Sequence, residues 1–249
     1  VRLVQAIKSI TGINIENPIE HLLVFCENYI DEFVAEDDMQ PSDNIEIPLM
    51  VSYKKLEEAL LSKDKNKCSK VLSELKRVSE GSQIFEFFIE YSLKYSNESL
   101  LVIWSIYRMS LFSNKQFINK EFSMCIDSIV GSSNLLDFKK INLDTMQNKE
   151  KINYTDLYYV LNDVYYSKTV RNEKMRKYLE GFSNYFYEGF NLSEYYSRNI
   201  LWSHVNNLRY EDLSVYNILK IDSLRGMMKI VEDEKMNPEE LYSIIDNYK

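Results

Sequence analysis

The chain has 249 residues, of which 45% are hydrophobic, and its formal net charge is −8. A chain of this length can bury one large core, or two smaller adjoining cores, without disulfides or metal ions. Its three cysteines, Cys26, Cys68 and Cys125, are widely spaced and match no CxxC or Cys/His pattern, which argues against a disulfide framework and a structural zinc site. We therefore expect a reducing, cytoplasmic environment and cysteines that act as small buried hydrophobic residues.

No secretion signal or membrane span is expected from the sequence. The first residues contain no basic region followed by an apolar block and a small-residue cleavage site, as a secretory signal requires. The longest nearly apolar stretch, 99–112, contains Arg108 and is too short to span a bilayer, so we interpret it as a central core helix. Few alanines, glycines and prolines against many Ile, Lys, Asn and Tyr residues indicate an AT-rich coding genome.

The first clear helix start is the run Asn17-Pro18-Ile19-Glu20. It combines an Asn cap, a proline at the first helical position and a glutamate that reaches back to the cap. The apolar residues that follow at spacings of three and four predict one buried stripe, made of Ile19, Leu22, Leu23, Cys26, Ile30, Phe33 and Val34.

The same start signal recurs at 191–194 and 237–240. Other helices are expected near 2–10, 48–62, 65–79, 83–96, 98–112, 115–130, 155–167, 170–188, 192–208 and 212–233. Turn dipeptides such as Asn-Gly and Asp-Gly are absent from the sequence, which disfavours hairpins. We predict an all-α protein, an irregular multi-helix bundle or helical array of roughly ten or more helices with no significant sheet.

A polar segment without periodicity, 131–153, is the expected linker or long loop. It would separate an acidic N-terminal helical half, 1–130, from a tyrosine-rich C-terminal helical half, 154–249, although one continuous domain is also compatible with the sequence.

No motif identifies a catalytic residue. The two histidines do not fall in a Glu-x-x-His pattern, and the six glycines form no phosphate-binding loop. Glu86 and Glu90, like Glu27 and Asp31, lie one helical turn apart and could hold a hard cation, but this spacing is common on solvated helix faces. We therefore expect no metal and no cofactor, and the sequence favours a protein that is not an enzyme.

Charge is unevenly distributed along the chain. Between Lys8 and Lys54 there are ten acidic residues and no lysine or arginine. Such a surface would repel nucleic acid and could attract a basic partner. The simpler interpretation is an acidic surface that keeps the protein in solution.

A short basic run is the candidate phosphate or nucleic-acid contact: Lys168, Arg171, Lys174, Arg176 and Lys177. On a continuous helix, Arg171, Lys174 and Tyr178 would share a face and could grip a phosphate beside an aromatic ring. Five charges are few for DNA or RNA, because affinity for nucleic acid depends on the sum of neutralised phosphates. This contact is expected only as part of a larger complex.

Tyrosine is concentrated in the C-terminal half, where twelve of the nineteen tyrosines lie between residues 150 and 216. Tyrosine has an apolar ring and a polar tip and suits partner interfaces and ligand pockets. Adjacent tyrosines on a helix diverge by about 100°, so one of each pair must leave the main buried stripe. The candidate partner or ligand surface is Tyr158, Tyr159, Tyr165, Tyr166, Tyr195, Tyr196 and Trp202. Alternatively, these residues fill two packing seams of one core.

Three functions are compatible with these features. The leading interpretation is a non-catalytic helical protein-interaction or scaffold subunit of a larger intracellular assembly, with one or more protein partners. One alternative is a helical enzyme or binding protein with an aromatic-lined pocket for an apolar small molecule. The other is a nucleic-acid-facing subunit that uses the basic run 168–177.

Overall fold

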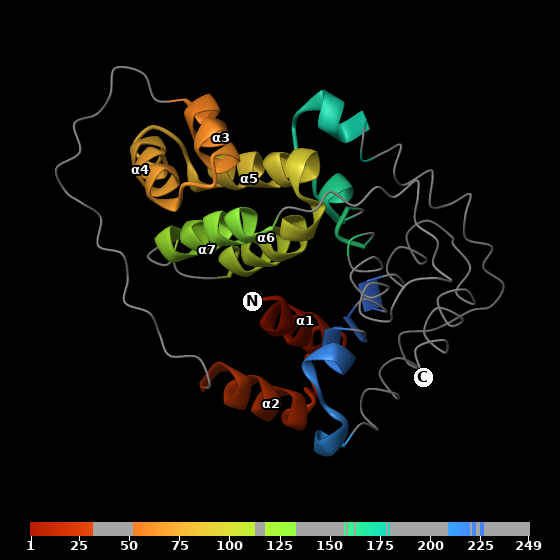
Figure 1. The fold of residues 1–249 in the computed structure, drawn as a ribbon. Helices are drawn as coiled ribbons and strands as arrows, with labels where there is room; N and C mark the ends of the chain where they lie inside the picture. The colour runs from red at the N-terminus through yellow and green to blue at the C-terminus, as the bar shows by residue number, and fades with distance from the viewer. Residues whose placement is uncertain are drawn as a thin grey trace, which may run out of the picture. The chain divides into compact units, whose positions relative to one another are not determined.

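The computed structural model describes residues 1–31, 52–112, 118–132, 157, 159–161, 163–177, 179, 209–219, 221–222 and 225–226. Its helices are α1 (Arg2–Thr11), α2 (Glu20–Asp31), α3 (Tyr53–Leu61), α4 (Lys65–Leu75), α5 (Gly81–Tyr95), α6 (Asn97–Ser110) and α7 (Ile118–Gly131), followed by the 3₁₀ turn η4 (Tyr210–Asp212) (Figure 1). Helical residues also occur within 157–167, 173–179 and 215–226. No strand is found among the residues that the structure describes, so the predicted all-α class is confirmed.

Side-chain caps explain where two of the helices begin. Ser52 has an extended backbone and its hydroxyl accepts from the N–H of Lys55, and the carboxylate of Asp64 accepts from the N–H of Lys67 at 3.0 Å. Both satisfy an N–H group that the first helical turn leaves without a carbonyl partner. The predicted starts at 191 and 237 lie outside the described residues.

Helix α2 begins later than its start signal suggests. Its first i to i−4 hydrogen bond joins the N–H of Leu23 to the carbonyl of Ile19, so the helix starts at Glu20 and not at Pro18. The predicted buried stripe is also only partly correct. Ile19 and Leu22 are buried and Cys26 is half-buried, whereas Leu23 and Ile30 are exposed.

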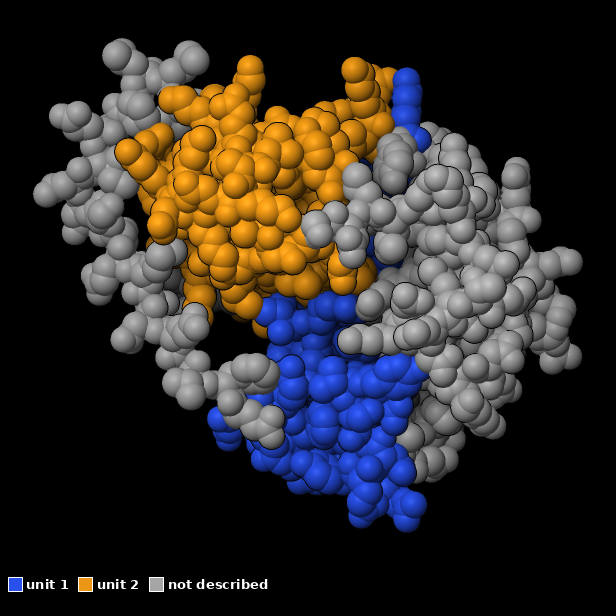
Figure 2. All heavy atoms as spheres, viewed as in Figure 1, with its two compact units in different colours: residues 1–35, 142–166, 176–249 blue, residues 36–141, 167–175 orange. Residues whose placement is uncertain are grey.

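The chain divides into two compact units, coloured separately in Figure 2. Unit 1 comprises residues 1–35, 142–166 and 176–249, and unit 2 comprises 36–141 and 167–175. Of the expected linker 131–153, only residues 131 and 132 are described, so that linker stays a prediction. Each unit contains segments that are distant in the sequence.

Unit 2 is built on α6, which packs against both α5 and α7, while α3 packs against α4. Five residues of α6 are buried hydrophobics: Leu100, Leu101, Ile103, Trp104 and Ile106. The ring of Phe122 from α7 lies 4.9 Å from Phe85 and 6.1 Å from Phe88 of α5, in tilted geometry. The expected core helix at 99–112 is therefore confirmed up to Ser110, whereas Leu111 and Phe112 follow the helix and are exposed.

Unit 1 has a core shared by the first two helices and residues 213–221. Leu3, Ala6, Ile7 and Ile10 of α1 and Ile19 and Leu22 at the start of α2 form one cluster with Leu213, Ile218 and Ile221. Helix α2 is also joined to η4, where the side-chain amide of Asn28 donates to the hydroxyl of Tyr210 at 2.9 Å. In the parts of the chain that are described, no helix is both long and apolar enough to cross a membrane.

A tight contact in unit 1 generates a first prediction. A Cβ atom built on Gly226 would collide with the ring of Tyr159, whereas one built on Gly131 meets nothing within 4 Å. Because an aromatic ring in a packed site cannot move aside cheaply, Gly226→Ala should lower the free energy of unfolding by about 1–3 kcal/mol. Urea unfolding followed by circular dichroism measures this change.

The matched control is Gly131→Ala in the last position of α7. Alanine favours a helix over glycine by up to about 1 kcal/mol, and nothing obstructs the added methyl group, so this variant should be neutral or more stable. Equal loss of stability in both variants would contradict the assigned packing at Gly226.

The cysteines generate a second prediction. All three are free thiols, Cys68 and Cys125 are buried and Cys26 is half-buried. Burial raises the pKa of Cys68 to about 11 and that of Cys125 well above its usual value. Because only the thiolate reacts, iodoacetamide at mildly alkaline pH should modify Cys26 first, and the other two only on unfolding. Rapid labelling of Cys125 in the folded protein, read by mass spectrometry, would contradict this order.

Candidate functional site

The basic run lies partly on a non-helical segment. Residues 169–172 are not helical, and the helix starts at Glu173, because the side-chain oxygen of Asn172 accepts from the N–H of Lys174 at 3.1 Å and caps it. The expectation that Arg171, Lys174 and Tyr178 share one helical face is therefore wrong for Arg171, which precedes the helix. An Asn-Glu pair is a recognisable start signal, and the sequence interpretation overlooked it.

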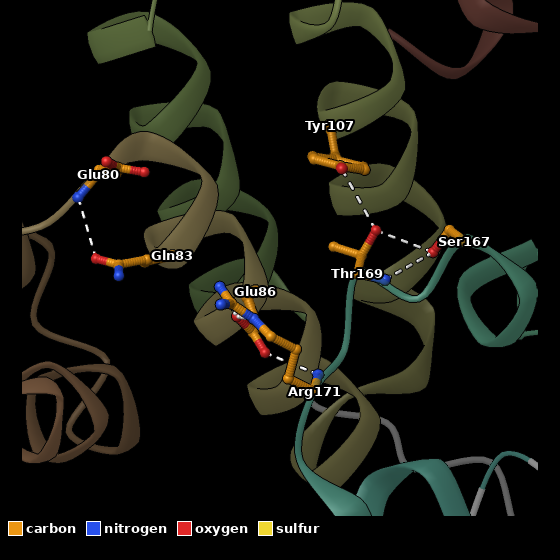
Figure 3. Close-up of polar contacts among 7 residues, drawn as sticks. All are labelled: Glu80, Gln83, Glu86, Tyr107, Ser167, Thr169 and Arg171. Carbon is orange, nitrogen blue, oxygen red and sulfur yellow. Dashed lines mark hydrogen bonds and ion pairs between the residues drawn. The ribbon is translucent and has the colours of Figure 1, made fainter.

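Arg171 binds a carboxylate of its own unit. Its backbone N–H donates to Oε1 of Glu86 at 2.8 Å, while Nε and Nη2 approach Oε2 at 3.0 and 2.9 Å (Figure 3). Glu86 lies on α5 and its side chain is only 15% exposed, against 68% for Arg171. Charge-assisted bonds in this paired geometry are stronger than neutral ones, so Arg171 anchors its segment to α5.

Further contacts hold the same segment, 167–175, on α5 and α6. The hydroxyl of Thr169 donates to that of Tyr107 on α6 at 3.3 Å and accepts from Ser167 at 2.9 Å (Figure 3). Val170 is buried. Lys168, between Ser167 and Thr169, adopts a positive φ of 57°. This conformation costs energy in a residue other than glycine, so neighbouring contacts must hold it in place.

Glu90, one turn after Glu86, is engaged by the next residue of the segment. Asn172 donates to it from both its backbone and its side chain. Burial first, and the nearby charge of Glu86 second, raise the pKa of Glu90, and the bonds from Asn172 oppose this rise. The two carboxylates considered as a cation site are thus used within the unit. Across the described part of the chain, no three His, Cys, Asp or Glu side chains are grouped as metal ligands would be.

The remaining members of the basic run are dispersed. Lys168, Lys174 and Lys177 are exposed. The guanidinium of Arg176 lies 5.6 Å from the ring centre of Tyr165, a cation–π arrangement. Arg171 and Arg176 thus contact groups of the chain itself.

The described tyrosines of the candidate surface have mixed surroundings. Tyr159 and Tyr165 are half-buried and Tyr166 is exposed, as expected for neighbours that diverge around a helix. The Tyr165 and Tyr166 rings meet edge to face at 5.1 Å. Tyr158, Tyr195, Tyr196 and Trp202 lie outside the residues whose side chains are described.

A half-buried ion pair contacts Tyr159. The guanidinium of Arg225 donates to the Tyr159 hydroxyl at 3.1 Å and to Asp222 at 2.7 Å, and it lies 5.4 Å from the Tyr159 ring. Burial is the main reason why the pKa of Tyr159 is raised. The Asp222–Arg225 spacing was visible in the sequence, but nothing there indicated that the pair would bind this tyrosine. Its role is structural, because each group satisfies another.

The outer face of α2 combines aliphatic and acidic side chains in contact with solvent. Leu23, Val24 and Ile30 are 38%, 40% and 48% exposed. Three exposed carboxylates, of Glu20, Glu27 and Asp31, alternate with them. The predicted burial of Leu23 and Ile30 is wrong, and these aliphatic residues share the exposed face with the acids.

The contacts of Glu86 generate a third prediction. Glu86→Ala removes the acceptor of the Arg171 N–H, so hydrogen exchange at that amide should accelerate and stability should fall by on the order of 1–2 kcal/mol. Glu58→Ala is the control, because Glu58 is an exposed acid of α3 in the same unit and its loss should leave that amide unchanged. Site-resolved exchange by NMR separates the two, and equal rates in both variants would refute the anchor.

Comparison with known proteins assigns no family to this geometry. No protein-family model matches the chain, and neither a curated protein nor a solved structure is detectably similar to it.

Proposed function

We propose that the chain is a non-catalytic protein-interaction subunit of a larger intracellular assembly, and that the outer face of α2 is one of its contact surfaces. The observation that carries this proposal is the exposure of Leu23, Val24 and Ile30 on a single helix of twelve residues. Leu22 is the one residue of α2 that is fully buried.

Exposed aliphatic residues are ordinary when they are scattered and informative when they are grouped. Covering apolar surface contributes about 25 cal/mol for each Å² removed from water, so a partner that covers these three side chains gains affinity. The surrounding carboxylates keep the free protein dispersed. An apolar centre with a polar rim is the usual composition of a protein interface.

The interactions of the other candidate residues favour the same proposal. The Glu86 and Glu90 carboxylates bind Arg171 and Asn172 of their own unit, so both have structural partners within the fold. Arg171, the central residue of the basic run, is paired with Glu86, and no observation favours nucleic acid over protein as the partner. The tyrosine surface stays a second candidate contact.

The fourth prediction tests this function by affinity capture from the native source. The wild-type chain should retain a partner that a Leu23→Ser/Ile30→Ser variant loses by about tenfold or more, because each buried aliphatic side chain contributes about 1.5–3 kcal/mol. Quantitative mass spectrometry of the captured proteins provides the measurement.

The control variant is Leu61→Ser/Val78→Ser, which removes two exposed aliphatic residues of unit 2. It should capture the partner as the wild type does. If the same proteins are recovered in equal amounts with all three chains, or if none is recovered with any, the outer face of α2 is not a partner surface.

A further inference from the structure

We propose that the outer face of α2 binds a basic amphipathic helix of the partner protein. This inference rests on the proposed function and adds the chemistry of the partner. It is carried by the arrangement of charge and apolar surface on α2.

The apolar and acidic residues are interleaved around the helix axis. At about 100° per residue, Leu23 and Ile30 lie within about 20° of each other, Glu27 lies next to them, and Glu20, Asp31 and Val24 follow within about 120° of Ile30. The opposite side carries Leu22, Phe25, Cys26 and Tyr29, which pack against or within the core of unit 1. The solvent side of α2 therefore carries Leu23 and Ile30 at one edge, Val24 at the other, and the three carboxylates between them.

The negative charge of this face is not compensated. Helix α2 contains no lysine or arginine, and none of its three carboxylates has a cationic partner within the described residues. Glu27 and Asp31 repel each other at the i, i+4 spacing. A cation placed between them would relieve this repulsion.

The spacing of the aliphatic residues favours a helical ligand. Leu23 and Ile30 are seven residues apart, which separates them by about 10.5 Å along α2. An amphipathic helix presents its own apolar residues at the i, i+3, i+4 and i+7 positions and places lysine or arginine beside them. Such a helix can cover these aliphatic residues and reach the carboxylates at the same time.

Other occupants fit less well. In a symmetric dimer the same patch faces itself, so a second copy would set three carboxylates of α2 against three of its partner. Nucleic acid would bring phosphates to the same carboxylates, and like charges across an interface cost several kcal/mol. The surface therefore selects a positively charged and partly apolar partner.

The fifth prediction tests this chemistry with three synthetic peptides of about 18 residues, a length sufficient for helix formation. One peptide is a leucine–lysine amphipathic helix, the second has the same composition in scrambled order, and the third replaces each lysine by glutamate. Isothermal titration calorimetry with the full chain should detect saturable binding of the first peptide alone. Its affinity should fall between about 50 and 300 mM NaCl because salt screens exposed charges.

Variants of the protein locate the binding site. Glu27→Gln/Asp31→Asn and Leu23→Ser/Ile30→Ser should each weaken binding of the amphipathic basic peptide about five- to tenfold. Glu27→Lys/Asp31→Lys should abolish it and gain binding of the glutamate peptide. The control Glu58→Gln/Leu61→Ser alters an exposed acid and an exposed aliphatic residue of α3 and should leave affinity unchanged. Circular dichroism confirms that each variant is folded.

Three results would overturn the inference: no binding of the basic amphipathic peptide at low salt, equal binding of the scrambled peptide, or affinities unchanged by the α2 variants. If one of these results is obtained while partner capture still depends on Leu23 and Ile30, the inference is wrong and the proposed function stands. If partner capture does not depend on Leu23 and Ile30, the proposed function of the α2 face is wrong.

Discussion

The packing of α1, the start of α2 and residues 213–221 around one apolar cluster is the interaction on which the rest of unit 1 depends. It joins segments about two hundred residues apart in the sequence. The entropy cost of closing this long loop must therefore be offset by the burial of Leu22, Ile10, Ile218 and their neighbours. Because only one side of α2 enters this cluster, the opposite side remains in water. The candidate contact surface thus results from how the core is closed.

Unit 2 adds to its apolar core a polar interaction of a different kind. Segment 167–175 lies on α5 through two consecutive residues that meet two successive turns, with Arg171 at Glu86 and Asn172 at Glu90. A half-buried carboxylate without such partners would be costly, so the segment and the helix stabilise each other. The same contacts engage Arg171 and both carboxylates within unit 2.

The surface of α2 and the anchor at α5 show opposite uses of charge. At α5 each negative group meets a donor of its own unit, and the result is structural. On α2 the carboxylates of Glu27 and Asp31 stay in solvent beside Leu23 and Ile30. A carboxylate that is already paired within its own unit is not available to a partner, whereas a solvent-exposed one can pair with a cation that a partner brings. For this reason we place the interaction on α2.

For the described residues, local signals in the sequence were enough to predict the all-α class, most helix positions, the core role of α6 and the burial of Cys68 and Cys125. Periodicity and turn chemistry act over a few residues, so these features are readable locally. The candidate site could be predicted only in part. The sequence shows the acids and aliphatic residues of α2, but it does not show which side of the helix faces water. That choice depends on residues 213–221, which no local pattern connects to α2. The pairing of Arg171 with Glu86 could not be predicted from the sequence either, because 85 residues separate them and only the tertiary structure brings their charges together.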